Sequence, residues 1–302
     1  MLSLLAFIVA SVSAQTTPQD EVRPAVRYNE VQQHTIHNAY AKQESLYSQL
    51  NDSRVRSLEI DIHNDHYRKV VPARDFAVYH FDFPFFDRTN CFLLSQCLEE
   101  IARFHREQPT HAPITLFIDL KDAFNAVHNA RSLDAQLRAQ LGEALFSPRE
   151  LTQQCADASN VKESVARCGW PTIDALRGRV LVVATGGDLC VQHGKRGPLG
   201  QYHRVSDAAM FVAPRAARCE ENKAAVFANL SEDELWQKPF NAVARVYRSA
   251  LRGGFNDAKS FAQALQARAQ FVATDKLDGD VLSWLARASV TPKTVATVST
   301  SP

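Results

Sequence analysis

The chain has few of the features that mark membrane-spanning, nucleic-acid-binding or fibrous proteins. Outside residues 1–14 it has no run approaching the roughly 20 consecutive apolar residues of a membrane-spanning helix. Neither charge sign is in excess, because 34 Lys and Arg residues face 33 Asp and Glu residues. The chain also has no internal repeat, low-complexity tract or long Gly/Ser linker. We therefore expect the chain beyond residues 1–14 to be soluble and to have no nucleic-acid partner. Its 45% hydrophobic and 22% charged residues are typical of a globular enzyme or binding protein.

Two short motifs are also missing. No CxxC pair occurs, so neither a zinc ribbon nor a thioredoxin-like site is indicated. The chain also has no GxSxG motif, so nothing indicates the nucleophile elbow of a serine hydrolase.

The chain does contain six cysteines, and an even number in an exported protein favours disulfides, with six buried thiols as the alternative. We expect neighbours in sequence to pair, because each bridge then closes a short loop outside the predicted strands. The expected pairs are Cys91–Cys97, Cys155–Cys168 and Cys190–Cys219.

The first fourteen residues have the pattern of a processing signal. Leu2 to Ala10 is almost continuously apolar, small residues lead to Ala14, and the chain then becomes polar. This order is typical of a secretory signal peptide cleaved after Ala14, with an ordinary N-terminal helix as the alternative. We therefore expect an extracellular protein with a single catalytic barrel domain over residues 15–290 and a disordered tail over residues 291–302.

Short β-branched runs alternate with helical patterns along the rest of the chain. Strands separated by helices predict βα units around a parallel sheet. Eight candidate strands in a chain of this length favour an α/β fold of the closed TIM-type (β/α)8 class over an open sheet. The predicted strands are Gln33–His37, Val55–Ile62, Phe76–His80, Ile114–Leu120, Arg179–Thr185, Ala209–Ala213, Ala224–Asn229 and Phe271–Thr274. The predicted helices include Cys91–Glu107, Asn129–Leu145, Ser231–Leu251 and Ala258–Arg268.

Polar residues stand at the ends of the first four predicted strands. They are His37 and Asn38, then Glu59 and Asp61, then His80, and then Asp119 and Lys121. Residues two apart on a strand share a face, so Glu59 and Asp61 point together into the barrel, where buried carboxylates need a cationic partner. Chemistry in such barrels gathers at the carboxyl ends of the strands. We therefore expect these side chains to meet there.

This set of residues indicates metal-assisted phosphoryl transfer. One Asn amide and three carboxylates form an all-oxygen ligand set, which suits Ca²⁺ or Mg²⁺ rather than Zn²⁺. Two histidines beside such a metal can assist an attacking hydroxyl and protonate a leaving oxygen, while Lys121 neutralises the phosphate. Each of these residues alone can be explained by an ordinary structural role. Because they occur in order over residues 37–121, a shared functional site is the better explanation.

The same segments resemble the phosphatidylinositol-specific phospholipase C superfamily, in particular its calcium-dependent secreted bacterial and fungal branch. The matching motifs are His37-Asn38-Ala39-Tyr40, Val55-Arg56-Ser57-Leu58-Glu59-Ile60-Asp61, Val78-Tyr79-His80 and Phe117-Ile118-Asp119-Leu120-Lys121. The resemblance covers residues 33–122 and, beyond them, Phe271-Val272-Ala273-Thr274-Asp275, which is similar to a last barrel strand. It implies a TIM-type barrel, often distorted. Metal-independent members have an Arg in place of the calcium, so the acidic pair here favours the calcium-dependent branch.

The resemblance also implies a role for each position. His37 would act on the inositol 2-hydroxyl, and His80 would be the general acid for the diacylglycerol oxygen. The implied calcium ligands are Asn38, Glu59, Asp61 and Asp119, with Mg²⁺ less suited. Lys121 and Asp275 are the substrate-site candidates; Lys121 has an ordinary surface lysine as its alternative, and Asp275 would orient a histidine from the last strand. The implied reaction is attack of the 2-hydroxyl on phosphorus, which yields a cyclic inositol phosphate.

Two other functions stay open on the sequence. A glycerophosphodiester phosphodiesterase or sphingomyelinase D-like barrel also combines a histidine pair with an ExD strand, but the former more often follows its histidine with Arg-Gly. A secreted barrel that uses the site only for binding is the non-enzyme alternative. No cluster of extra Lys and Arg near the motifs marks a polyphosphate site, which favours unphosphorylated phosphatidylinositol as the phospholipid partner. We expect a monomer. Four phenylalanines after His80 either contact the membrane surface transiently or pack beneath their loop: Phe81, Phe83, Phe85 and Phe86.

Overall fold

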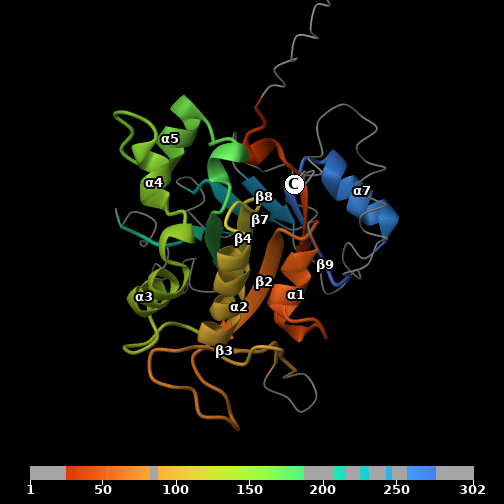
Figure 1. Cartoon of the computed structure of the whole chain (residues 1–302), viewed down its shortest axis with the longest axis vertical. Helices are drawn as coiled ribbons and strands as arrows, with labels where there is room; N and C mark the ends of the chain where they lie inside the picture. Colours follow the sequence, from red (N-terminus) through yellow and green to blue (C-terminus); the bar gives the residue numbers. More distant parts are fainter. Residues whose placement is uncertain are drawn as a thin grey trace, which may run out of the picture.

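Eight parallel strands follow one another in a continuous sheet in the computed structural model of the chain. The structure describes residues 25–52, 54–81, 88–186, 207–214, 225–230, 243–246 and 257–276, and Figure 1 shows helices around the sheet. The strands are β1 (Gln33–Ile36), β2 (Ser57–His63), β4 (Ile114–Leu120), β5 (Val180–Gly186), β6 (Phe211–Val212), β7 (Phe227–Leu230), β8 (Val243–Val246) and β9 (Phe271–Thr274). Their spatial order is β6-β5-β4-β2-β1-β9-β8-β7, and neighbours run parallel throughout. The two strands at the ends of this order follow each other in the chain, as in a TIM-type barrel.

The barrel has a seam between β6 and β7. These strands form no ladder with each other in the described part of the chain. The seam is bridged just beyond β6, where the backbone N–H of Asn229 donates to the carbonyl of Pro214 at 3.2 Å. The rings of Phe211 and Phe227 also pack across it, with centroids 5.2 Å apart. The fold expected from the sequence, a TIM-type barrel with distortion, is therefore confirmed.

One of the eight predicted barrel strands is wrong. The segment Phe76–His80 contains only a short strand, β3 (Ala77–Val78), which pairs antiparallel with the end of β2 and lies outside the ring. The chain turns back along β2 there, so His80 does not sit at the end of a parallel strand.

The missing barrel strand is β8, in a segment for which the sequence predicts the helix Ser231–Leu251. Pairing with β7 on one side and β9 on the other gives this segment ladder hydrogen bonds that outweigh its helical periodicity. The rest of that predicted helix, residues 231–242 and 247–251, lies outside the described residues.

Two apolar layers hold the fold together. On β2 and β4 the even-numbered apolar residues pack outward against helices, whereas Phe117 faces the inner cluster. The helices are α1 (Leu46–Asn51), α2 (Leu94–Glu107), α3 (Ala130–Leu141), α4 (Pro148–Gln153), α5 (Val161–Cys168) and α7 (Ala258–Gln266). Short 3₁₀ turns are η1 (Tyr28–Glu30), η2 (Ala39–Ala41), η3 (Gly142–Ala144) and η4 (Asp174–Leu176). Within the described ranges, no helix combines the length and apolar character needed to cross a bilayer.

The inner layer closes the amino-terminal end of the barrel with aromatic rings. Tyr28 packs on Trp170 with centroids 5.1 Å apart, and Phe117 meets Phe271 at 5.3 Å. All four side chains are buried. A packed apolar floor leaves the carboxyl ends of the strands as the open end at which polar groups can gather.

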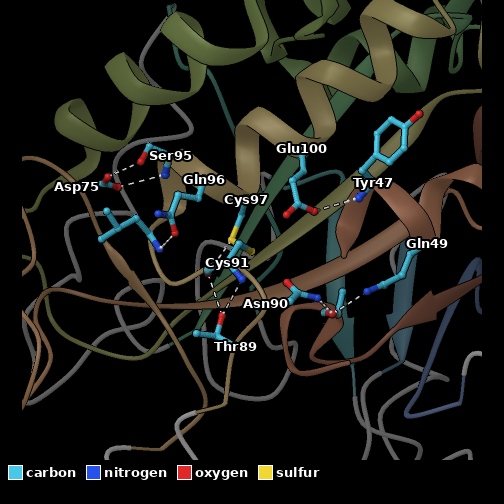
Figure 2. The surroundings of a disulfide bond; sticks show 12 residues. Tyr47, Gln49, Asp75, Thr89, Asn90, Cys91, Ser95, Gln96, Cys97 and Glu100 are labelled. Carbon is cyan, nitrogen blue, oxygen red and sulfur yellow. Dashed lines mark hydrogen bonds between the residues drawn. A yellow bond between two sulfur atoms is a disulfide. The ribbon is translucent and has the colours of Figure 1, made fainter. Parts of the chain in front are cut away.

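Two of the expected disulfides are confirmed, Cys91–Cys97 and Cys155–Cys168, whereas Cys190 and Cys219 lie outside the described residues. Figure 2 shows that the first of these bridges ties the segment before α2 to that helix. Next to it, the side-chain amides of Asn90 and Gln49 both donate to the carbonyl of Ala39, at 3.4 and 2.8 Å (Figure 2). The disulfide region therefore supports the turn that follows β1.

Arg56 and Arg54 allow a matched test of what supports this side of the barrel. The buried guanidinium of Arg56 donates to the carbonyls of Leu50 and Asp52 at the end of α1 and to that of Val55, and it lies over the ring of Phe104. Arg54, two residues earlier, pairs with Asp52 at the surface. We expect Arg56→Ala to lower the free energy of unfolding by about 2–4 kcal/mol, because it leaves buried carbonyls without their donor. Arg54→Ala should cost less than about 1 kcal/mol. Urea unfolding monitored by circular dichroism measures both, and equal losses would contradict this account.

Candidate active site

The parallel register places three carboxylates together at the open end of the barrel. Asp61 on β2 stands directly beside Asp119 on β4, and Glu59 precedes Asp61 by two residues on the same face. One oxygen from each of the three side chains lies within 4.8 Å of the others. Glu59 and Asp61 are buried. Negative groups this close repel one another strongly in a desolvated site, so the cluster requires positive charge nearby.

The two oxygens of Asp61 have different surroundings. Oδ2 accepts from the Tyr40 hydroxyl at 2.9 Å and from His80 Nδ1 at 2.8 Å, and it lies 3.2 Å from Lys121 Nζ. Oδ1 is buried and has no hydrogen-bond partner among the described residues. Burial opposes ionisation of this carboxyl, but His80 and Lys121 outweigh it and keep the pKa of Asp61 below its ordinary value. The carboxylate is therefore ionised, with one oxygen left over for a ligand.

Lys121 supplies a fixed positive charge inside the cluster. Its ammonium lies 2.7 Å from Asp119 Oδ2 as well as close to Asp61. Burial alone would lower the pKa of Lys121, but the surrounding carboxylates raise it above its usual range. Burial and the neighbouring charges of Asp61 and Glu59 raise the pKa of Asp119, which Lys121 opposes. One ammonium partly compensates three acidic groups, which leaves the pocket attractive to a further cation.

Each of the two histidines is held by a carboxylate at its Nδ1 atom. His37 Nδ1 lies 2.6 Å from Asp275 Oδ1, just after β9, and His80 Nδ1 is bonded to Asp61. In each ring the carboxylate engages Nδ1, which leaves Nε2 to face elsewhere. His37 Nε2 lies 4.0 Å from Glu59 Oε2. The ring centroids of His37 and His80 are 6.5 Å apart, and the two rings meet edge to face, so both histidines lie next to each other at the acidic cluster.

Asn38 lies at the bend between β1 and η2. It has the left-handed conformation, with φ 49° and ψ 53°, which Asn tolerates better than most residues. Its side chain is buried, and Oδ1 has no hydrogen-bond partner among the described residues. A buried amide oxygen of this kind is a candidate ligand for a cation.

The structure therefore brings the sequence-predicted site residues to one end of the barrel, and it adds two that the sequence analysis missed. Tyr40 belongs to the first motif but had no assigned role; burial and nearby Asp61 raise its pKa, so its hydroxyl stays protonated and donates. Gly186 ends β5 with φ 116°, and a Cβ there would lie 2.8 Å from Asp119 Oδ1 and 2.4 Å from the Leu120 carbonyl. Its only sequence signal is its place at the end of a predicted strand.

Comparison with known proteins adds a family to this geometry. The profile of the family described as phosphoinositide phospholipase C, Ca²⁺-dependent, matches residues 75–282. No curated protein matches the chain in sequence. The fold is similar to a calcium-dependent phosphoinositol-specific phospholipase C from Pseudomonas sp., with 22% identity, a TM-score of 0.68, and coverage of 84% of this chain and 92% of that one. It is also similar to a Ca²⁺-dependent phosphatidylinositol-specific phospholipase C from Streptomyces antibioticus, with 21% identity, a TM-score of 0.65, and coverage of 84% and 96%.

Gly186 and Gly142 test how closely the acidic pocket depends on packing. Both have positive φ, a conformation that favours glycine, so an added Cβ strains the backbone at either position. A Cβ at Gly142 meets no atom within 4 Å, whereas one at Gly186 presses on Asp119. We expect Gly186→Ala to weaken Ca²⁺ binding about 10- to 100-fold and Gly142→Ala to leave it unchanged. Isothermal titration calorimetry checks this, and similar affinities for the two variants would argue against a role for Gly186.

Proposed function

The chain belongs to the Ca²⁺-dependent phosphoinositide phospholipase C family and is a phospholipase C-like phosphodiesterase, and we propose that its substrate is phosphatidylinositol. The inositol 2-hydroxyl would attack phosphorus and expel diacylglycerol, leaving a cyclic inositol phosphate. The observation that carries this proposal is the pair of neighbouring histidines, each with Nδ1 against a carboxylate, beside a cluster of three acidic groups.

Calcium suits the oxygen atoms of this pocket. Ca²⁺ takes six to eight oxygen ligands in flexible geometry, whereas Mg²⁺ demands a stricter octahedron and keeps more water. Glu59, Asp61 and Asp119 offer carboxylates, and the Oδ1 atoms of Asp61 and Asn38 are buried without a hydrogen-bond partner in the described part of the chain. These four side chains would hold the ion. When bound, Ca²⁺ supplies positive charge that favours ionisation of the attacking hydroxyl and stabilises charge on the phosphoryl oxygens.

His37 is suited to take the proton of the 2-hydroxyl. Its Nδ1 hydrogen points to Asp275, so the neutral ring carries its lone pair on Nε2. The imidazolium that forms is stabilised by Asp275 on one side and by Glu59 near Nε2 on the other. Lys42 donates to the backbone carbonyl of Asp275 at 2.8 Å, which fixes the position of that residue after β9.

His80 is suited to deliver a proton to the leaving oxygen. Asp61 accepts from its Nδ1 and orients the ring, so that a hydrogen on Nε2 can pass to the glycerol oxygen. Lys121 stands beside the same carboxylate and can neutralise a phosphoryl oxygen. One turnover leaves His37 protonated and His80 neutral. The opposite assignment then suits hydrolysis of the cyclic product, in which His80 activates water and His37 protonates the 2-oxygen.

We also propose that the protein acts outside the cell. Two disulfides close loops at Cys91–Cys97 and Cys155–Cys168, and such bonds persist in oxidising compartments. The apolar segment over residues 1–14, which lies outside the described residues, would direct export. The remaining domain boundaries and the monomeric state stay predictions of the sequence.

The reaction is tested by ³¹P NMR of phosphatidylinositol vesicles with the purified chain, in Ca²⁺ and in excess chelator. We expect a cyclic inositol phosphate resonance in Ca²⁺ and none in chelator. Glycerophosphoinositol as a second substrate separates the alternatives: release of glycerol 3-phosphate without a cyclic intermediate would favour a glycerophosphodiesterase, and tight binding without turnover would favour a binding protein.

The two histidines should differ in their response to the leaving group. Either His→Ala change should lower kcat for phosphatidylinositol by about 10³-fold, within the range for one lost acid or base. An inositol phosphodiester with a p-nitrophenolate leaving group needs no proton at that oxygen, so it should restore much of the rate to His80→Ala and little to His37→Ala. Steady-state kinetics on both substrates measure this, and equal rescue of both variants would reject the assigned roles.

A further inference from the structure

Large, exposed apolar side chains lie in the connections that follow β2 and β4, two neighbouring strands of the barrel. In the described part of the chain they are Tyr67, Val70, Phe81 and Val127, and Val70 is 91% exposed. The first three lie between β2 and α2, and Val127 lies between β4 and α3. Both connections start at the carboxyl ends of strands that carry the acidic pocket. Exposed apolar groups grouped in this way mark an interaction surface more often than scattered ones do.

The most exposed of these groups belongs to a loop that we call the cationic loop, Tyr67–Arg74. It lies in the connection from β2 to β3, which extends beyond the end of the sheet in Figure 1. Val70 to Ala73 form an apolar tip, flanked by three exposed cations, Arg68, Lys69 and Arg74. No ion pair joins these cations to a carboxylate of the described residues, in contrast to Arg54 and Arg103 elsewhere on the surface.

The base of the loop is firmly built. The buried ring of His66 accepts from the backbone N–H groups of Arg68 and Lys69 at 3.0 and 3.2 Å. The same ring packs edge-on against Tyr79 and Phe92, with centroids 4.9 and 5.3 Å away. Lys69 Nζ lies 4.4 Å from the centroid of Phe92. These contacts hold the base of the loop in place and so fix the position of its tip.

This support is continuous with the site. Tyr79 immediately precedes His80, and its hydroxyl donates to the carbonyl of Asp65 at the start of the loop connection, at 3.1 Å. The strand that leads into the connection, β2, carries Glu59 and Asp61. A flat surface that contacts the loop therefore lies beside the catalytic histidine and the acidic pocket.

We propose that the cationic loop docks the protein on a bilayer that contains anionic phospholipid. Val70 enters the boundary between head groups and acyl chains, and Arg68, Lys69 and Arg74 contact phosphates. An apolar tip with flanking cations complements both layers of such a membrane, whereas an acidic protein would use the cations and leave Val70 in water. The inference rests on the proposed function only in that the bilayer carries the substrate.

Vesicle flotation tests the docking without the reaction. The full chain is mixed in chelator with vesicles of phosphatidylcholine alone or with 30 mol% phosphatidylglycerol, neither containing an inositol lipid. We expect binding to the anionic vesicles and little to the neutral ones. The triple change Arg68→Gln, Lys69→Gln and Arg74→Gln should lower the partition coefficient on the order of 100-fold. Val70→Asp should lower it by about tenfold through loss of the apolar contact.

A charge-matched control separates the loop from net charge. The triple change Arg149→Gln, Lys162→Gln and Arg167→Gln removes the same charge from exposed sites on α4 and α5, which lie far from the loop in Figure 1. It should leave vesicle binding within about twofold of the parent, and thermal melts establish that every variant is folded. Absence of binding to anionic vesicles, equal binding to neutral ones, or an equal loss in the control would each overturn the proposal. Because no substrate or Ca²⁺ is present, failure of docking is distinguishable from failure of the proposed chemistry.

Discussion

The mutual repulsion of Glu59, Asp61 and Asp119 is the constraint on which the open end of the barrel depends. Three carboxylate oxygens within 4.8 Å of one another are tolerated only because positive groups converge on them. Asp61 shows this most clearly, since one of its oxygens receives the Tyr40 hydroxyl, the His80 ring and the Lys121 ammonium. The same contacts that stabilise the cluster orient the ring of His80. Structural and chemical roles of the acidic residues therefore cannot be separated at this site.

The barrel provides the rigidity that such a cluster needs. Parallel pairing sets Asp61 beside Asp119, and pairing of β1 with β9 brings His37 to Asp275 from the other end of the chain. Loops alone would not hold these groups at hydrogen-bond distance against their charge. Where the chain does leave the sheet, it is supported: the amides of Asn90 and Gln49 converge on Ala39, next to the Cys91–Cys97 bridge. The packing on one side of β1 thus reaches the turn that carries His37.

The sequence predicts those parts of the site that depend on strand alternation. Glu59 and Asp61 share a face because they are two apart on a strand, and the apolar residues between them identify the opposite face. The place of His80 could not be found in this way, because its segment turns back antiparallel along β2 and reaches Asp61 from outside the ring. Strand β8 was hidden by helical periodicity, which two neighbouring strands override. Gly186 was missed because its importance lies in the space beside Asp119, which only packing shows.

The cations near the acidic cluster and the cations of the loop have different surroundings and therefore different proposed roles. Cations near the pocket are engaged with acids, as Lys121 is with Asp61 and Asp119, and so add little field beyond the site. The chain as a whole carries a net charge of only +1, which gives it little long-range attraction to an anionic surface. At physiological salt the screening length is about 8 Å, so only cations that reach the surface contribute. Arg68, Lys69 and Arg74 meet this condition on a loop beyond the sheet. A short cationic loop beside the site can therefore set the orientation of a nearly neutral protein, with the open end of the barrel facing the lipid.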